Sequence, residues 1–210
     1  MSEPMSEPMS EPASAPVSGR SYRGDDWYGD ELVDVVYESC NFSDVDLTEA
    51  TTRGVMFSEC TFHTCRFNAS THVSTAFIAA DFRRCNFFDV TLEGCKLDGS
   101  VFSECTMRPM KVSGGSWRSV TLRGANLGGL DMRGLDLRES DLSMSDLTGA
   151  VLRDAKLDGA TVRETTLARA DLRGASLAGV DLREATLKDT RLDLPGAVHL
   201  AELYGADVEP

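Results

Sequence analysis

Residues 170–189 read Ala-Asp-Leu-Arg-Gly, Ala-Ser-Leu-Ala-Gly, Val-Asp-Leu-Arg-Glu and Ala-Thr-Leu-Lys-Asp, which are four copies of one five-residue unit. The first place of each unit holds a small residue and the third holds leucine. In steps of five, the third place runs from Leu32 to Leu192 without an insertion, and only Thr52 and His72 are polar among its 33 positions. Neither a helix, with a period of 3.6, nor a strand, with a period of 2, gives this register. The pattern therefore predicts a repeat architecture.

Two inward places out of five need a backbone that makes about a quarter turn per unit, so that four units close one coil of about 20 residues. Coils stacked at the strand spacing of roughly 4.8 Å pair their backbone groups, and the large residues form ladders inside. The repeat predicts about eight such coils. Phenylalanine fills most central places up to Phe102 and leucine takes over from Leu122, so we expect two coil geometries that meet near residues 107–110.

The unit, written Ala-(Asp/Asn)-Leu-x-x, resembles the pentapeptide-repeat family over residues 27–194. Within that family the chain is similar to the Qnr/MfpA group of fluoroquinolone-resistance proteins, on residues 56–62, 100–110 and 122–152. The uninterrupted register is similar to that of the members without inserted loops, of which MfpA is the type. The resemblance implies an all-β fold, namely a right-handed quadrilateral β-helix with a short C-terminal helix.

The sequence divides into three parts. Residues 1–26, with three Met-Ser-Glu-Pro repeats, are predicted to be a disordered N-terminal tail, because their composition offers little to bury. Residues 27–194 form the predicted β-helix, and residues 195–210 a C-terminal capping and dimerisation helix. The leader lacks the basic and apolar regions of a signal peptide, and no apolar run is long enough to span a membrane. We therefore expect a cytoplasmic protein without a membrane partner.

Several residues are of types that often form metal or catalytic sites, but they occupy regular places of the five-residue repeat. All six cysteines occupy the small place of the unit: Cys40, Cys60, Cys65, Cys85, Cys95 and Cys105. This confinement favours reduced thiols that serve as small core residues over a disulfide framework or a metal site. Thr52 and His72 are 20 residues apart, which predicts a hydrogen-bonded pair on adjacent coils rather than a ligand site. No phosphate-loop, nucleophile-elbow or zinc-protease motif occurs. We expect no enzyme activity, no catalytic residue, no metal and no cofactor.

Charge is distributed unevenly along the chain. The formal net charge is −13 and the pI is near 4.6, which argues against direct binding of nucleic acid. Residues 1–104 carry 18 acidic and 7 basic side chains, whereas residues 105–210 carry 16 and 14. The acidic residues of the first half have few basic neighbours in the sequence, so they form either a docking surface for a partner or a solvated surface. This candidate acidic set is Asp44, Asp46, Glu49, Glu59, Asp81, Asp89, Glu93, Asp98 and Glu104.

The register ends at Leu192, and the residues that follow predict a helix at about 195–204. Pro195 and Gly205 stand where proline and glycine favour a helix start and end. The segment has more apolar residues than one open coil needs for a cap, which predicts a two-fold dimer contact. The candidate dimer residues are Ala197, Val198, Leu200, Ala201, Leu203 and Tyr204.

The resemblance also implies a function. It predicts a dimeric rod that binds DNA gyrase, a type II topoisomerase, inhibits it by imitating duplex DNA and can protect it from fluoroquinolones. The alternative is a structural interaction rod with an unknown protein partner. Contiguous negative potential on the surface would favour the first function over the second.

Overall fold

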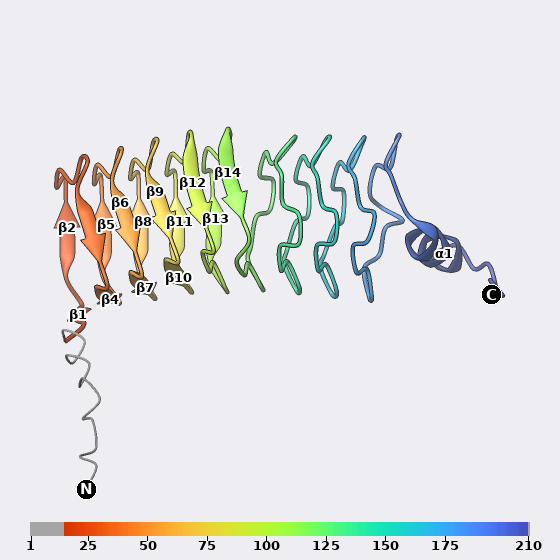
Figure 1. Cartoon of the computed structure of the whole chain (residues 1–210), viewed down its shortest axis with the longest axis horizontal. Helices are drawn as coiled ribbons and strands as arrows, with labels where there is room; N and C mark the ends of the chain where they lie inside the picture. Colours follow the sequence, from red (N-terminus) through yellow and green to blue (C-terminus); the bar gives the residue numbers. More distant parts are fainter. Residues whose placement is uncertain (1–14, 210) are drawn as a thin grey trace, which may run out of the picture.

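A left-handed backbone conformation at one place in each unit turns the chain through the corners of a four-sided coil. The computed structural model describes residues 15–209, and Figure 1 shows the coils stacked into a straight rod with a helix at its C-terminal end. The second residue after nearly every central residue has a positive φ, for example 56° at Asp44, 53° at Glu59 and 69° at Gly124; Pro109 and Glu184 are the exceptions among the described coils. Side chains rarely accept this conformation, so its recurrence every five residues shows that the corners require it.

Three parallel sheets run along the rod, and each forms one face. The β1 face consists of β1 (Val17–Ser18), β4 (Val36–Glu38), β7 (Met56–Ser58) and β10 (Ala76–Ile78). The β2 face consists of β2 (Ser21–Arg23), β5 (Asn41–Ser43), β8 (Thr61–His63), β11 (Asp81–Arg83) and β13 (Val101–Ser103). The β3 face consists of β3 (Glu31–Val33), β6 (Thr51–Arg53), β9 (Thr71–Val73), β12 (Val90–Glu93) and β14 (Met110–Ser113).

The fourth side, the bridged face, is held by single parallel bridges that join Asp26, Asp46, Arg66, Asn86 and Thr106 in turn. Every pairing joins residues 20 apart, as in Phe62 with Phe82, so each coil takes 20 residues. The predicted quadrilateral β-helix is therefore confirmed. Its geometry fixes which side chains point inward and which share one outer face.

The coil geometry changes near residue 110. Regular strands end at β14, and single bridges continue the 20-residue offset as far as Asp171 and Arg191. From Val120 onward the corner N–H on every face donates to the carbonyl three residues earlier, as from Ala150 to Leu147. In the earlier coils this bond occurs mainly on the bridged face. Pro109 marks the change, because its ring fixes φ near −65° and prevents a left-handed corner. The transition lies where the core composition predicted it.

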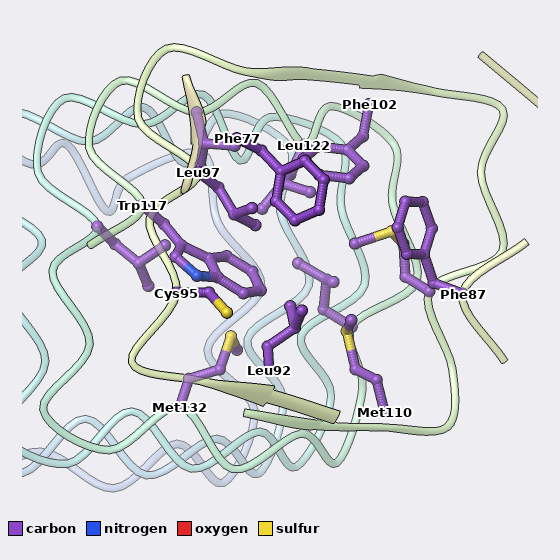
Figure 2. Packing of buried hydrophobic residues seen from close by; sticks show 14 of the residues in the cluster. Phe77, Phe87, Leu92, Cys95, Leu97, Phe102, Met110, Trp117, Leu122 and Met132 are labelled. Atoms are coloured by element: carbon purple, nitrogen blue, oxygen red, sulfur yellow. The ribbon is translucent and has the colours of Figure 1, made fainter. Parts of the chain in front are cut away.

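Stacked aromatic rings build the first half of the core. Phe42, Phe62, Phe82 and Phe102 form one ladder, with successive ring centroids 4.7, 4.7 and 4.6 Å apart. Neighbouring ladders meet edge to face, which is the other favourable arrangement of aromatic pairs. Figure 2 shows the indole of Trp117 directed into the core near Cys95, at the transition to the leucine-rich half. Smaller side chains then fill the remaining coils.

The rod begins earlier than the sequence predicted. β1 and β2 lie within residues 1–26, which were assigned to the tail, and they pair with β4 and β5 through Val17 with Tyr37 and Tyr22 with Phe42. The tail assignment was wrong for residues 17–26, because Tyr22 stacks on Phe42 with ring centroids 4.9 Å apart and so continues the core ladder. The rest of the predicted tail, residues 1–14, lies outside the described residues.

The chain ends in α1 (Leu194–Leu203), close to the predicted helix. Asp193 caps it by accepting a hydrogen bond from the Gly196 N–H at 3.0 Å, and its second carboxylate oxygen accepts from the Gly174 N–H at 2.7 Å. His199 contacts the Val180 carbonyl at 2.7 Å. These contacts fix the helix across the last coil.

We expect Phe62→Ala to lower the free energy of unfolding by about 3–5 kcal/mol, because it leaves a cavity between two stacked rings. The matched control is Phe88→Ala, since Phe88 is 49% exposed and its removal should change stability by less than about 0.5 kcal/mol. Urea unfolding of both variants measures the difference. Equal losses would contradict the ladder as a source of stability.

Candidate protein-interaction surfaces

The candidate acidic set does not form one surface. Glu59 and Asp98 lie on the β1 face, and Glu93 lies on the β3 face. The β2 face carries Asp44, Asp81 and Glu104, and the bridged face carries Asp46, Glu49 and Asp89. The sequence placed them in the same half of the rod, but the 20-residue coil distributes them around it. No single face brings all of them together.

Most of this set already has a partner, which corrects the expectation of few partners. Four members make ion pairs with side chains on the same or adjacent coils: Asp46 with Arg66, Asp81 with Arg83, Asp89 with Lys111 and Glu104 with Arg84. Three more accept hydrogen bonds from hydroxyl groups, namely Asp44 from Thr64, Glu59 from Ser39 and Asp98 from Ser116. The partners were missed because they lie about 20 residues away or two residues along a strand.

A stronger concentration of acid lies nearer the N-terminal end. Residues 25–49 contain no lysine or arginine and nine acidic residues: Asp25, Asp26, Asp30, Glu31, Asp34, Glu38, Asp44, Asp46 and Glu49. We call these residues the acidic end; they occupy the first two coils, and Figure 1 places these coils at the end of the rod opposite α1. The candidate acidic set left out the first six, of which Asp25 and Asp26 had been assigned to the tail. The run of acids without a base was the signal that could have found them.

The second half of the rod is neutralised locally. Within one unit, the aspartate before and the arginine after a central leucine both point outward, and three such pairs, each on a different face, are bidentate: Asp136 with Arg138, Asp171 with Arg173 and Asp181 with Arg183. The Arg138 guanidinium lowers the pKa of Asp136 below its usual value by hydrogen bonding. Such pairs leave this half with little net field, so it is a weak candidate for a surface that attracts a basic partner.

α1 has two different sides. Leu200 and Leu203, two of the candidate dimer residues, pack against the core of the rod, so they form the cap. On the other side Ala197 and Tyr204 are exposed, Tyr204 to 70%, and Leu194 joins them at 77%. Leu194 was missed because the helix was predicted to begin at Pro195. The exposed stripe of α1 is thus Leu194, Ala197 and Tyr204, with the half-buried Val198 and Ala201 at its edge.

The six thiols are free, five of them buried and Cys105 half-buried. Each donates to a carbonyl of the coil beneath, as Cys85 does to Phe62 at 3.4 Å. The confinement of cysteine to the small place thus has the packing role that the register predicted. Among residues 15–209 no group of three or more His, Cys, Asp or Glu side chains is placed to hold a metal ion. The voids inside the core are about 10 Å³ and lined by apolar side chains only.

No helix in the described part of the chain is long and apolar enough to cross a membrane.

Thr52 and His72 belong to a linear series of buried hydrogen bonds, which confirms the predicted polar pair. The Ser70 hydroxyl donates to the Phe67 carbonyl at 2.7 Å, so it accepts from His72 Nε2 at 2.9 Å. Thr52 then donates to His72 Nδ1 at 2.7 Å and accepts from the Thr75 hydroxyl at 2.6 Å. Both imidazole nitrogens are satisfied in the neutral ring, and burial lowers the pKa of His72 to about 4.

This buried imidazole predicts a pH dependence of stability. The unfolded chain binds a proton at His72 near pH 6.5 and the folded chain only near pH 4, so stability falls as pH falls through that window. The loss by pH 4 is about 3 kcal/mol. His72→Leu, which matches the Leu92 of the next coil, should flatten the dependence of the urea midpoint between pH 7 and 4.5. An unchanged slope in that variant would contradict the assignment.

The pentapeptide repeat region profile matches residues 60–142, and eight copies of the pentapeptide repeat profile match residues 150–189. Trypsin-treated QnrB1, a plasmid-mediated fluoroquinolone resistance protein, aligns with a TM-score of 0.61 at 18% identity, over 92% of this chain and 99% of that one. Full-length QnrB1 aligns with a TM-score of 0.53 at 20% identity, over 91% and 100%. No curated protein matches the sequence. The repeat profiles, the 20-residue coil and the shared fold together show that this chain belongs to the pentapeptide-repeat family.

Proposed function

We propose that this chain binds DNA gyrase on the surface that gyrase uses for DNA, and inhibits supercoiling by imitating duplex DNA. The observation that carries the proposal is the acidic end, with nine acidic and no basic residues over residues 25–49 of a straight rod. Duplex DNA carries one negative charge per about 1.7 Å of its axis, so an imitator needs dense acid with few basic partners. Within the acidic end Glu31 and Asp46 alone are ion-paired, with Arg53 and Arg66. Only this part of the described rod is without an interspersed base over such a length.

The likeness of fold to QnrB1 supports the same direction, because that protein is named for fluoroquinolone resistance. A rod that occupies the DNA site of gyrase lowers the amount of gyrase–DNA complex, and this complex is what a fluoroquinolone traps. Protection from the drug would thus follow from competition with DNA. The proposal needs no catalytic residue and no direct contact of the rod with nucleic acid.

The second candidate is a structural interaction rod with another protein partner. The nearly neutral second half of the rod favours this function, because Asp136, Asp171 and Asp181 each form an ion pair with an arginine two residues away. In that function the acidic end would serve solubility or a different basic partner. A supercoiling assay separates the two functions directly.

We expect the purified protein at micromolar excess to inhibit supercoiling by gyrase, and the inhibition to weaken as salt rises, because exposed charges are screened within about 8–10 Å at moderate ionic strength. Glu38→Lys with Glu49→Lys should weaken inhibition at least tenfold. The matched control is Glu164→Lys with Glu184→Lys, which changes the charge equally in the neutralised half and should have less than a threefold effect. Undisturbed supercoiling by the unmodified protein would favour the interaction rod instead.

We also propose a homodimer through the exposed stripe of α1. Leu194 and Tyr204 expose apolar surface at the end of the rod although the cap is already formed by Leu200 and Leu203. Two such stripes related by a two-fold axis would cover each other. The acidic ends would then lie at the two far ends of a longer rod.

Tyr204→Asp with Leu194→Asp should convert the dimer into a monomer of unchanged thermal stability. Leu203→Asp should instead destabilise the last coils, because it places a charge against the core. Sedimentation equilibrium gives the mass, and circular dichroism the stability. A dimer that persists in the double variant would place the contact elsewhere.

A further inference from the structure

The two ends of the rod are finished differently. α1 covers the last coil, whereas no element among residues 15–209 lies beyond the first coil, as Figure 1 shows at the end that carries β1 and β2. A parallel sheet normally has a neighbour on both sides, and an uncovered edge strand pairs readily with another chain. The first coil is therefore an unpaired edge of three faces and one bridge row.

Backbone groups of the first coil point out of the rod. In the second coil the N–H groups of Asn41, Asp46 and Thr51 donate to the coil beneath at 2.8, 3.0 and 2.8 Å. Ser21, Asp26 and Glu31 hold the equivalent places one coil earlier, and within the described residues no coil lies beneath them. Their N–H groups, with the carbonyls beside them, form the template onto which an extended segment can add.

The side chains of this edge form an apolar floor. Val17, Tyr22, Trp27 and Leu32 occupy the central places of the first coil and are only partly buried, whereas their successors Tyr37, Phe42, Leu47 and Thr52 are buried. One further layer of side chains would bury this floor to the same extent. An added strand with apolar side chains on its inner face supplies that layer.

Acidic groups surround the floor on two sides. Asp25 and Asp30 stand in the small corner place of the unit, where no other acidic residue occurs between residues 25 and 190. Asp26, Glu31 and Asp34 continue the rim along the bridged face and the β3 face, and all three are exposed. In the later coils the corner place is mostly buried and holds small or apolar residues, chiefly alanine, valine, cysteine, serine and threonine. The charge at this edge is complementary to lysine and arginine.

Neither the N-terminal residues of this chain nor a second molecule of it is well suited to bind at this edge. Continuing the register backward would place Pro12, Glu7 and Ser2 in the central places, where the repeat from Leu32 to Leu192 has apolar residues at all but two positions. Residues 1–14 also carry three glutamates and no base, which the acidic rim repels. A second copy docking end to end would bring two acidic rims together. The complementary occupant is a basic segment of another protein.

We propose that the N-terminal edge of the rod binds an extended, basic segment of a partner protein by strand addition. The segment bends with the coil at the Asp30 corner, so that its backbone pairs with the bridged face at Asp26 and with β3 at Glu31–Val33. It places apolar side chains over Trp27 and Leu32 and directs lysine or arginine toward Asp25, Asp30 and Asp34, because Glu31 already pairs with Arg53. The interaction uses backbone pairing at the open end and does not require gyrase.

The test uses the full chain and a fluorescein-labelled peptide, Lys-Val-Arg-Val-Lys-Val-Arg, with both ends blocked. Fluorescence anisotropy measures its binding. The same peptide with methyl groups on alternate backbone nitrogens keeps its charge but cannot pair as a strand, and it should bind at least tenfold more weakly. Iodide quenching gives a second readout, because half-buried Trp27 should be shielded on binding while fully buried Trp117 does not respond.

Asp25→Asn with Asp30→Asn should weaken binding at least tenfold, because it removes two negative charges from the edge. The fold should be kept, because asparagine retains the side-chain oxygen that accepts a hydrogen bond from the Arg23 N–H. The matched control, Asp154→Asn with Asp189→Asn, removes two exposed charges in the second half and should change binding less than twofold. Equal binding of the methylated peptide, or an equal loss in the control variant, would show general charge attraction and overturn the proposal. The methylated peptide decides this with unmodified protein even if a variant fails to fold.

Two further outcomes would identify another occupant. Tighter peptide binding by the full chain with Met5→Ser and Met9→Ser would show that the N-terminal residues already cover the edge. Conversion of a dimer into a monomer on peptide binding, measured by sedimentation, would show that a second copy covers it. Either outcome would overturn the assignment to a basic partner, and neither depends on the result of the supercoiling assay.

Discussion

The left-handed corner residue is the constraint on which the rest of the structure depends. Nearly every unit places one residue at positive φ, and glycine does so at Gly124, Gly134 and Gly149 without a steric cost. Aspartate, glutamate, serine and arginine occupy the same place elsewhere, so the pairing of coils outweighs the local preference of these residues. Pro109 cannot adopt the conformation, and the sheets end one unit later.

The same corner geometry separates packing from recognition. Two places in five point inward and are restricted to apolar or small residues, while the other three face solvent. The outward-facing residues form the interaction surfaces of such a rod, and equivalent residues of successive coils stack at the strand spacing. Acid can therefore accumulate at one end and ion pairs at the other without any change of fold. Similarity of fold to another rod consequently carries little information about the surface.

The buried chain around His72 shows how the core tolerates polarity. Thr52, Ser70, Thr75 and His72 satisfy one another across two coils, which avoids the free-energy cost of a lone buried polar group. The cost reappears only when the imidazole must be protonated. This group of hydrogen-bonded residues therefore stabilises the core at neutral pH and destabilises the fold in acid.

The sequence by itself determined the coil, the inward places, the role of the cysteines and the pairing of Thr52 with His72, because all of these follow from a register that repeats every five residues. It also located the change of geometry near Pro109. It did not determine where the rod begins, since Asp25 and Asp30 interrupt the small place of the unit between Tyr22 and Leu32, and the first two central residues, Val17 and Tyr22, were therefore assigned to the tail. Only the tertiary structure decided which charges are compensated, because the partner of a side chain such as Asp46 lies 20 residues away on the next coil. Likewise, the division of α1 into a capping side and an exposed side depends on how the helix lies across the last coil. Contacts between elements set both outcomes, and a one-dimensional pattern does not contain them.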